Sequence, residues 1–519
     1  MVQKSPRAAT PVRPPSPVNR PASSPASSPS SGQGLDRFFG ISARRSTITR
    51  EVRGGFVTFF SMAYIIALNP IIVGTTPDVN GNLISGLPIS GDGNVPLTMA
   101  MVAAATAVVA GVMTLIMGLV GKFPVALAAG LGINALAAYT IAPTMTWGQV
   151  MGLIVWEGII ITILVLTKFR KAVMDAVPKS LRTGISVGIG LFIALIGLVD
   201  SGFVRKGSQM GELGIGGSII GWPLLVFVVV LVALIIMHVK KVKGAMLIAI
   251  IGGTVFAVIL EAIVKVGGSV DADGNAVATG WRLNVPQLAA GQSWLPNLEL
   301  LKFWQHVDLL GAFHADFKAW AVVIMTILAL MLADFFDTMG TIVAIGKTGN
   351  LLQPDGNPPR TQQILLVDSI AAMAGGLCST SSNTSYIESA SGVSDGARTG
   401  FANIITGAAF LVATFITPLV NLVPSEAVAP VLVLVGFLMM QQITDIEWSN
   451  LEVALPAFFL VTMMAFTYSI TVGMGLGFIV YLVIKLVKGR SRDVSPLLWV
   501  IAVLFLVYFM QGLIMGWLG

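Results

Sequence analysis

The chain has 519 residues, of which 55% are hydrophobic and only 11% are charged, and its formal net charge at pH 7 is +6. A soluble globular protein has about 25% charged residues, so this composition, with a mean hydropathy of +0.85, excludes a soluble domain. Its repeated apolar stretches suit α-helices that cross a hydrocarbon core of about 30 Å, whereas β-barrel strands would be shorter and would alternate. We therefore expect an all-α polytopic membrane protein.

The N-terminal residues 1–35 are rich in Pro, Ser, Ala and Arg and contain no acidic residue and no apolar run. Such a segment cannot bury a core, so we expect a disordered cytoplasmic tail. An organelle transit peptide is the alternative, but the frequent Pro and the lack of an amphipathic helix disfavour it. The single cysteine, Cys378, permits neither a disulfide framework nor a thiolate metal cage, and we expect it to be a small packing residue.

Fifteen apolar segments follow, at residues 54–73, 97–121, 126–143, 148–167, 182–199, 220–238, 244–264, 320–346, 364–378, 384–396, 399–420, 427–441, 450–468, 470–487 and 496–518. The third and tenth are short and rich in small or polar residues, so they would not insert as ordinary spans. Counting both as crossings places nearly all Lys and Arg of the short loops on one side, which the positive-inside rule makes cytoplasmic. Arg205 and Lys206 are the exceptions, and the long segment 265–319 is expected to be an extracellular or periplasmic loop.

The two halves of the chain are weakly similar. The stretch "VPKSLRTGISVGIGLF" (177–192) aligns with "VPSEAVAPVLVLVGFL" (423–438), at the fifth and twelfth segments. Because a repeat of seven spans is odd, the second copy must be inverted, which predicts an inverted-repeat transporter. We expect the first repeat at 36–264 and the second at 320–490. The C-terminal apolar segment 491–519 is then left over: either it is an added helix that places the C-terminus outside, or one predicted span is wrong.

The third and tenth segments are candidates for the discontinuous helices that form midplane substrate sites in this kind of fold. The third reads "FPVALAAGLGINALAAYTI", in which Pro124, Gly130 and Gly132 permit a break and Asn134 is the only amide. The tenth begins "STSSNTSYIE", which is too rich in Ser and Thr for a lipid-facing helix. It predicts a short extended piece followed by the start of a helix.

Glu388 has two interpretations. Ser385 and Glu388 have the spacing of a capping box, in which the Glu only completes a helix start. However, an ionisable residue in the middle of a membrane span costs several kcal/mol and usually faces a substrate or ion pathway. We favour the functional interpretation.

The eighth segment carries an acidic motif, "ADFFDTMGT". Asp334, Asp337, Thr338 and Thr341 are spaced so that one helix face is polar and should look inward. One alternative is that the span ends near Asp334, but the sequence stays apolar after the motif. A Mg²⁺ site on the two aspartates is a second alternative, disfavoured because further acids and a polyphosphate-binding partner are lacking.

Other ionisable residues form no catalytic pattern. The acids Glu157, Glu261 and Asp368 are each isolated from a second polar feature in the sequence, which favours helix-packing or interfacial roles. His238, His306 and His314 lie beside loops without ligand spacing. Since no nucleophile elbow, phosphate loop or zinc motif is present, we expect no enzyme, no metal, no cofactor and no nucleic-acid partner.

Four motifs resemble a known family. The stretches "GGFVTFFSMAYIIALNP", "AAGLGINALAAY", "FFDTMGT" and "TSYIESASGV…GARTGFANIITG" are similar to those of the AzgA-like purine permeases, a branch of the nucleobase–cation symporter 2 (nucleobase–ascorbate transporter) superfamily. The resemblance covers about residues 36–490. It implies about 14 spans in two inverted seven-helix repeats, a core domain at about 54–167 and 320–420, and a gate domain at about 177–264 and 427–487.

The resemblance also implies a function. It implies proton-coupled import of adenine, guanine and hypoxanthine across the plasma membrane, by an elevator-type or rocking motion of core against gate, and a possible homodimer. The family's substrate-binding acids fall on Asp337 by the D-T-x-G pattern and on Glu388 by the Y-x-E pattern, and its asparagine falls on Asn134. The chain departs from the family's usual P-G-M-G-L-N with Ala129, Leu131 and Ile133, and segment 496–518 departs from the fourteen-span scheme.

The chemistry of a purine fits these residue types. A carboxylate can accept N–H bonds from the ring edge, and backbone N–H groups at a broken helix can serve the ring nitrogens. Phe335, Tyr386 and Thr338 are expected near the ring, with Phe336, Phe59 and Phe60 as other stacking candidates. Because a dry site favours the protonated form of a carboxyl group, Asp337, Glu388 or Asp334 is expected to carry the coupled proton.

Several rival functions stay open. A uracil or xanthine permease of the same fold is one, and an anion transporter of that fold is another, although acids near the midplane argue against an anion. An intramembrane enzyme would need a nucleophile or metal triad. A channel would lack saturable, counterflow-capable uptake.

Overall fold

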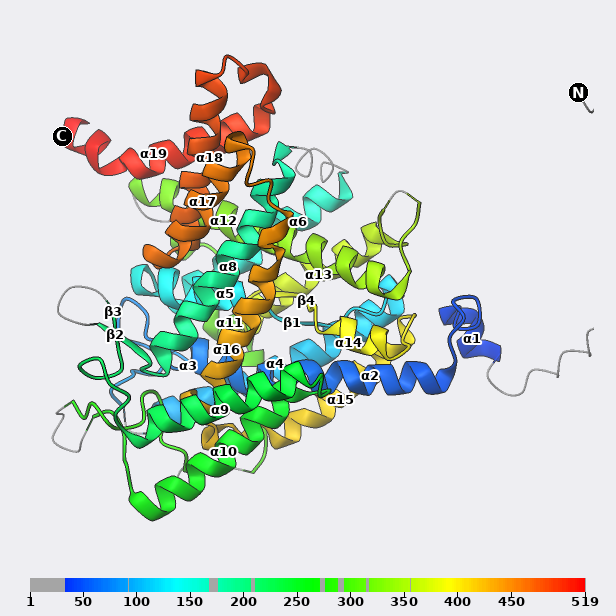
Figure 1. Cartoon of the computed structure of the whole chain (residues 1–519), viewed down its shortest axis with the longest axis vertical. Coiled ribbons are helices and arrows are strands. Elements are labelled where there is room, and N and C mark those ends of the chain that lie inside the picture. The colour runs from blue at the N-terminus through cyan, green and yellow to red at the C-terminus, as the bar shows by residue number, and fades with distance from the viewer. Residues whose placement is uncertain are drawn as a thin grey trace, which may run out of the picture.

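A computed structural model describes residues 33–91, 93–167, 176–206, 211–270, 276–287, 294–313, 317–354 and 356–518. Within these ranges the chain is almost entirely helical, with strands in two small antiparallel pairs (Figure 1). The all-α class predicted from the composition is confirmed. Most of the expected N-terminal tail, together with His314, lies outside the described residues.

The first half of the chain contains α1 (Gln33–Phe39), α2 (Ile48–Met62), α3 (Ile65–Gly74), α4 (Asn94–Ile116), β1 (Leu127–Ala129), α5 (Leu131–Ala135), α6 (Trp147–Leu166), α8 (Lys179–Asp200), β2 (Val204–Lys206), β3 (Gly211–Leu213), α9 (Trp222–Val239) and α10 (Ala245–Val264). The second half contains α11 (Phe303–His306), α12 (Phe317–Gly349), α13 (Thr361–Leu377), β4 (Asn383–Ser385), α14 (Ser389–Ser394), α15 (Phe401–Ala413), α16 (Ser425–Met440), α17 (Leu451–Phe466), α18 (Ile470–Val487) and α19 (Pro496–Leu518).

Every predicted apolar segment has a structural counterpart. Among the described residues, 10 helices are long and apolar enough to cross a membrane, and Leu451–Phe466 and Pro496–Met510 are shorter apolar helices. The ninth predicted segment is α13, and the third and tenth are the short elements around β1 and β4. Boundaries differ where charges occur: the first span begins at Ile48 rather than 54, because the side chain of Thr47 caps the helix and its first turns tolerate Arg and Glu.

The predicted breaks in the third and tenth segments are confirmed. β1 and β4 pair in antiparallel register, with Leu127 opposite Ser385 and Ala129 opposite Asn383, and a short helix follows each strand. Unpaired backbone groups are costly in a membrane, and here neighbouring side chains satisfy several of them. Nδ2 of Asn403 donates to the carbonyls of Phe123 and Val125 at 2.8 and 2.7 Å.

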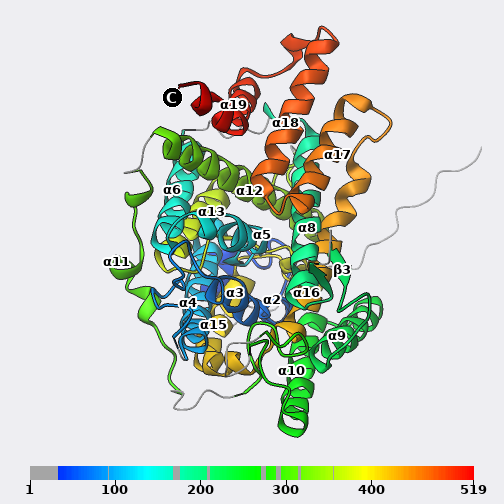
Figure 2. The ribbon, with the colours of Figure 1, turned by 90° about the vertical axis from the view of Figure 1, so that its left-hand side faces the viewer.

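Two sets of helices pack closely among themselves (Figure 2). The first set contains α2–α6 and α12–α15, and the second contains α8–α10 and α16–α18. We call the first set the core and the second set the gate below; α2, α12 and α16 begin before the residue ranges expected for those domains. β1 and β4 lie inside the core.

Glycine pairs allow the two repeats to approach closely. Gly118 lies in the π-helical turn Met117–Gly121 that continues α4, and a Cβ added to it would lie 2.6 Å from the carbonyl oxygen of Gly400, the residue before α15. In the gate, a Cβ added to Gly190 would lie 2.8 Å from the carbonyl oxygen of Gly436. Small residues at such positions are typical of tightly packed membrane helices.

The ends of the spans are tied to the long loop and to the C-terminal helix. Oε2 of Glu261, at the end of α10, accepts a 2.7 Å hydrogen bond from the indole of Trp281 in the 265–319 loop. The predicted segment 496–518 forms α19, which packs against α18 and α12 (Figure 1).

Candidate functional site

A cavity of about 1250 Å³ separates the core from the gate. Core residues on its wall come from the α2–α3 turn, the β1–α5 break, α12 and the β4–α14 segment, whereas gate residues come from α8, the α9–α10 loop and the end of α16. The segments that the sequence predicts to be discontinuous therefore meet the gate at this cavity.

The two aspartates of the eighth segment have different environments. α12 continues to Gly349, so the alternative that the span ends near Asp334 is wrong. Asp337 is half-buried and lines the cavity. Asp334, one turn earlier, is 1% exposed, and neither of its carboxylate oxygens has a hydrogen-bond partner. The structure thus brings Asp337 to the cavity and leaves Asp334 behind its wall.

Glu388 follows β4 and lines the same cavity. The hydroxyl of Tyr64, in the α2–α3 turn, donates a 2.5 Å hydrogen bond to Oε1 of Glu388. The capping-box interpretation is wrong, because α14 begins at Ser389 without a side-chain cap and Ser385 donates its hydroxyl to Asp368 instead. The Glu388 carboxylate therefore serves the cavity and not the helix start.

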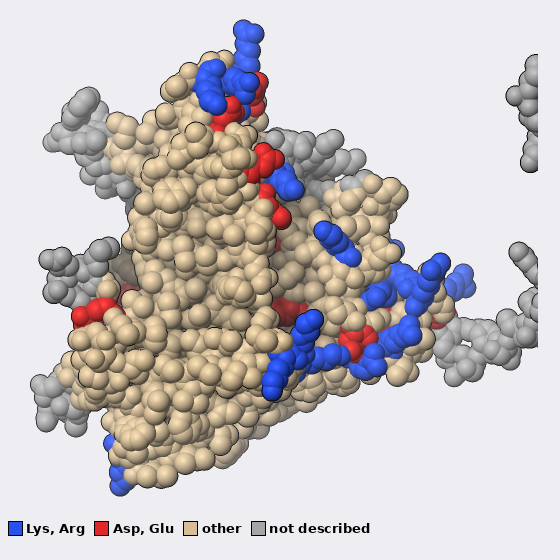
Figure 3. Space-filling view, viewed as in Figure 1, with Lys and Arg blue, Asp and Glu red and all other residues tan. Residues whose placement is uncertain are grey.

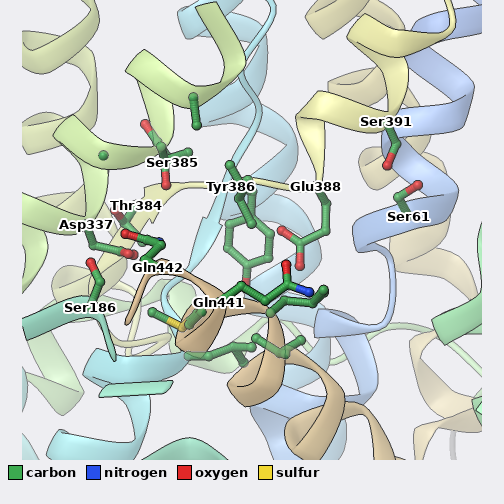
Figure 4. Close-up of a pocket in the computed structure, with 18 of the residues that line it drawn as sticks. Ser61, Ser186, Asp337, Thr384, Ser385, Tyr386, Glu388, Ser391, Gln441 and Gln442 are labelled. Atoms are coloured by element: carbon green, nitrogen blue, oxygen red, sulfur yellow. The ribbon is translucent and has the colours of Figure 1, made fainter. Parts of the chain in front are cut away.

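Tyr386 stands between the two cavity acids (Figure 4). Its hydroxyl donates to the carbonyl oxygen of Ala129 at 2.5 Å, and its backbone N–H donates to the carbonyl of Ala126 at 3.0 Å. These bonds hold an aromatic ring at the crossing of the two broken segments. Asp337 and Glu388 interact electrostatically across this region.

Three predicted site residues lie behind the cavity wall. Asn134 is fully buried, and its Nδ2 donates to Oδ1 of Asn69 at 2.7 Å. Thr338 is also buried and donates to Asp368 at 2.8 Å. Phe335 packs against Phe336, with ring centroids 5.6 Å apart, and it is Phe336 that reaches the cavity. These residues support the wall and do not form its surface.

Some cavity residues were not predicted from the sequence. In Figure 4, Ser186 and Gln442 from the gate lie beside Asp337, and Gln441 lies below Tyr386. Two adjacent glutamines at the end of an apolar segment indicate a polar site, but the prediction from the sequence rested mainly on ionisable residues and on the amide of the third segment. Nothing in the sequence singled out Ser186, because a lone serine in a span is common.

One end of the cavity is basic. Its lining includes Lys179 at the start of α8 and Lys241 and Lys243 of the α9–α10 loop, on the side that the positive-inside rule makes cytoplasmic. Lys243 of the gate forms an ion pair with Asp395 of the core, which also pairs with Arg53 of α2. The hydrogen bonds from Lys243 and Arg53 hold the pKa of Asp395 below its ordinary value, against the opposing effect of burial. Figure 3 shows Lys and Arg gathered on this side, over α1, α2 and α14.

No metal centre is found in the described ranges: no group of three or more His, Cys, Asp or Glu residues there could hold a metal ion. The D-x-x-D motif places its two carboxylates in different environments, one at the cavity and one buried. The chemistry that this arrangement offers is hydrogen bonding and proton exchange by carboxyl groups beside an aromatic ring.

Comparisons with known structures establish the fold. The transmembrane domain of the cyanobacterial bicarbonate transporter BicA matches with a TM-score of 0.53 at 16% identity, over 82% of this chain and 96% of that one. SLC26A9 matches with a TM-score of 0.54 at 13% identity, over 92% and 73%. These transporters share the inverted-repeat fold, so that prediction is confirmed.

Comparisons with known sequences establish the family. A model described as "Permease family" matches residues 50–476. The guanine/hypoxanthine permease PbuG of Bacillus subtilis (strain 168) is 32% identical over 92% of this chain and 99% of its own length. The adenine permease AdeP of Escherichia coli (strain K12) is 33% identical over 92% and 96%. These relatives are transporters and not enzymes, and the chain belongs to their family, the nucleobase–cation symporter 2 permeases.

Proposed function

We propose that this protein imports purine nucleobases, namely adenine, guanine and hypoxanthine, by proton symport. The names of its relatives support a nucleobase as the substrate. The observation that carries the proposal is the cavity in which Asp337 and Glu388 stand on either side of the Tyr386 ring (Figure 4).

The cavity matches the chemistry of a purine. A purine edge carries N–H donors that a carboxylate can accept, and Asp337 and Glu388 supply such acceptors. The rings of Tyr386 and Phe336 offer flat apolar faces for stacking, and the amides of Gln441 and Gln442 can both donate and accept hydrogen bonds. We assign Asn134, Thr338 and Phe335 to positioning this surface from behind.

The proposed transport cycle depends on movement between the core and the gate, which form the two walls of the cavity. The lining of the cavity reaches the basic residues Lys179 and Lys241, which the positive-inside rule makes cytoplasmic, so this conformation is open to the cytoplasm. Movement of the core past the gate, as an elevator or by rocking, would open the acids to the other side. The proposal includes a plasma-membrane location with the N-terminus in the cytoplasm, and a homodimer stays a prediction from the family resemblance.

An anion transporter is the rival that the fold neighbours suggest, since BicA is a bicarbonate transporter. Two carboxyl groups on the cavity wall disfavour an anionic substrate, because like charges repel strongly where water is scarce. Uracil and xanthine are neutral and differ from the proposed purines in their pattern of donors and acceptors, so they must be separated by experiment.

The test is uptake of radiolabelled adenine, guanine, hypoxanthine, xanthine and uracil in cells that lack nucleobase transport, with and without a protonophore. We expect saturable accumulation of purines that the protonophore abolishes. Competition by uracil alone would refute the purine assignment. Accumulation that persists after collapse of the proton gradient would refute proton coupling, and non-saturable flux would indicate a channel.

A further inference from the structure

Two buried carboxyl groups of the core have no hydrogen-bond partner. Glu157 on α6 is 0% exposed and Asp334 on α12 is 1% exposed, and all four of their carboxylate oxygens are unpartnered. An ionised carboxylate that is removed from water without a partner is strongly disfavoured. A neutral, protonated carboxyl group is the form that such a site accepts.

These two groups belong to a cluster with Asp368 of α13. Glu157 interacts electrostatically with Asp368, and Asp334 interacts with both Asp368 and Glu157. Their isolation in the sequence, which favoured packing or interfacial roles for Glu157 and Asp368, is therefore not found in space. Among the described residues, no Lys, Arg or His forms an ion pair with any of the three. The other charged group that faces them is Asp337.

The cluster borders a polar segment whose buried side chains also lack hydrogen-bond partners. Between α13 and β4, the hydroxyls of Ser379, Ser381 and Ser382 and Nδ2 of Asn383 are buried and lack partners. The hydroxyls of Ser382 and Thr384 are close enough to act on Glu157 and Asp334, respectively, but neither forms a hydrogen bond of good geometry with the carboxyl group. Buried polar groups are nearly always satisfied in native proteins, so this set indicates a place where protons, and the water that carries them, are bound.

Asp368 connects the cluster to the substrate cavity. Its Oδ1 accepts a 2.8 Å hydrogen bond from Ser385, and its Oδ2 accepts one of 2.8 Å from Thr338. The Thr338 hydroxyl also lies 2.7 Å from that of Thr384. Thr384 and Ser385 line the cavity and directly precede Tyr386, which is two residues before Glu388. A change at the cluster would therefore be transmitted to the segment that carries the proposed substrate contacts.

We propose that Glu157, Asp334 and Asp368 together form the proton-holding site of the transporter, distinct from the carboxyl groups that contact the purine. Asp368 accepts two hydrogen bonds, which favour its ionised form, while Glu157 and Asp334 hold the protons. Three adjacent acids titrate as a unit, so the cluster gains a proton when the core faces the more acidic side and loses it on the other. This inference rests on the proposed function, because it locates the coupled proton.

The test separates binding from coupling. Glu157→Gln replaces a protonated carboxyl group with a neutral amide of similar shape. In proteoliposomes with the full-length protein, we expect purine binding and purine exchange across the membrane to persist. Accumulation driven by a proton gradient should be lost, and the pH dependence of uptake should flatten. One coupled proton supports about 50-fold accumulation for each 100 mV, so the expected ratio falls from that order to about one.

Asp334→Asn serves as a second, independent variant if Glu157→Gln does not fold, and Glu299→Gln, in the outer loop, is the control that should accumulate purine normally. Wild-type accumulation and pH dependence in both cluster variants would overturn the inference while leaving purine symport intact. Loss of purine binding together with accumulation would also overturn it, as would wild-type uptake driven by a sodium gradient alone. Wild-type protein that transports no purine would instead refute the proposed function.

Discussion

The hydroxyl of Tyr64 donates a 2.5 Å hydrogen bond to Oε1 of Glu388, across 324 residues of sequence. Tyr64 lies in the turn between α2 and α3, and Glu388 lies between β4 and α14. The bond joins the two halves of the chain at the cavity, and it holds one oxygen of the Glu388 carboxylate in place.

Removal of this bond should weaken purine recognition without unfolding the protein. Hydrogen bonds to charged groups contribute about 1.5–3 kcal/mol, so Tyr64→Phe should raise the KM or Kd for the purine by about 10- to 100-fold. Tyr139→Phe is a matched control, because Tyr139 also donates a hydrogen bond to a carboxylate, that of Asp200, at 2.8 Å. Unlike Tyr64 and Glu388, Tyr139 and Asp200 do not line the cavity. Equal affinity in both variants would contradict a role of Tyr64 in the site.

The cavity acids and the buried acids should respond differently to neutralisation. Asp337→Asn and Glu388→Gln each remove a carboxylate from the cavity wall, and we expect both to abolish purine binding measured by calorimetry. Asp334→Asn alters a residue one turn away that is outside the cavity, so binding should persist while accumulation is lost. Retained binding in Asp337→Asn would show that the D-T-x-G motif selects the wrong aspartate.

Gly340 provides a direct probe of the cavity. It lies on α12 one turn after Asp337, lines the cavity, and a Cβ added there meets no atom within 4 Å. In a Cys378→Ala background, Gly340→Cys should react with a hydrophilic thiol reagent, and a bound purine should slow the reaction. Gly34→Cys is the control: its Cβ also meets nothing, but it lies exposed on α1 and outside the cavity, where a bound purine should not change the reaction rate.

The close contact between the π-helical turn Met117–Gly121 and the start of α15 should be sensitive to any added side chain. A Cβ at Gly118 would lie 2.6 Å from the carbonyl oxygen of Gly400, and overpacking of this kind costs about 1–3 kcal/mol. Gly118→Val should therefore lower the midpoint of thermal unfolding in detergent. Gly252→Ala, which meets no atom, should leave it unchanged. A normal midpoint in Gly118→Val would mean that the helices can move apart at no cost.

The sequence predicts the fold well because a bilayer imposes strong local rules. Apolar length defines the spans, and the Ser and Thr before Tyr386 identify the β4 break, since such residues have no place on a lipid-facing helix. The ends of spans are predicted less well, as at Ile48. The charged residues in the first turns of α2 lower its local hydropathy, but the N-cap Thr47 still allows the helix to begin there. The sequence motifs correctly select Asp337 and Glu388 as residues that line the cavity. They do not show that Asn134 is hydrogen-bonded to Asn69 and does not line the cavity.

Contacts between distant spans are what the sequence could not supply. Glu157 and Asp368 are each isolated on their own helices and become a cluster only when α6 packs against α13 and α12. Ser186 and the pair Gln441 and Gln442 reach the cavity because the gate packs against the core. These relationships depend on tertiary geometry, which no local pattern encodes.

The ion pair between Lys243 and Asp395 should stabilise the conformation described here. It joins the α9–α10 loop of the gate to the segment after α14 of the core, and the two must separate if core and gate move apart. Lys243→Ala should therefore shift the protein toward the opposite-facing state. The measurement is labelling of Gly340→Cys from the cytoplasmic side, which should slow. Lys240→Ala, an exposed neighbour at the start of the same loop that does not line the cavity, should leave the rate unchanged.

The pH dependence of this contact follows from the direction of the pKa shift. Hydrogen bonds from Lys243 and Arg53 lower the pKa of Asp395, so the stabilisation is present above the ordinary value of about 3.9 and is lost only as the pH falls through the lower, folded value. Between about pH 5 and 8 the pair stays ionised, and the effect of Lys243→Ala on cytoplasmic labelling should be constant. An effect that disappears between pH 7 and pH 5 would contradict this assignment. It would mean that proton-dependent movement of the core acts through the Lys243–Asp395 contact, and not through the buried acids of α6, α12 and α13.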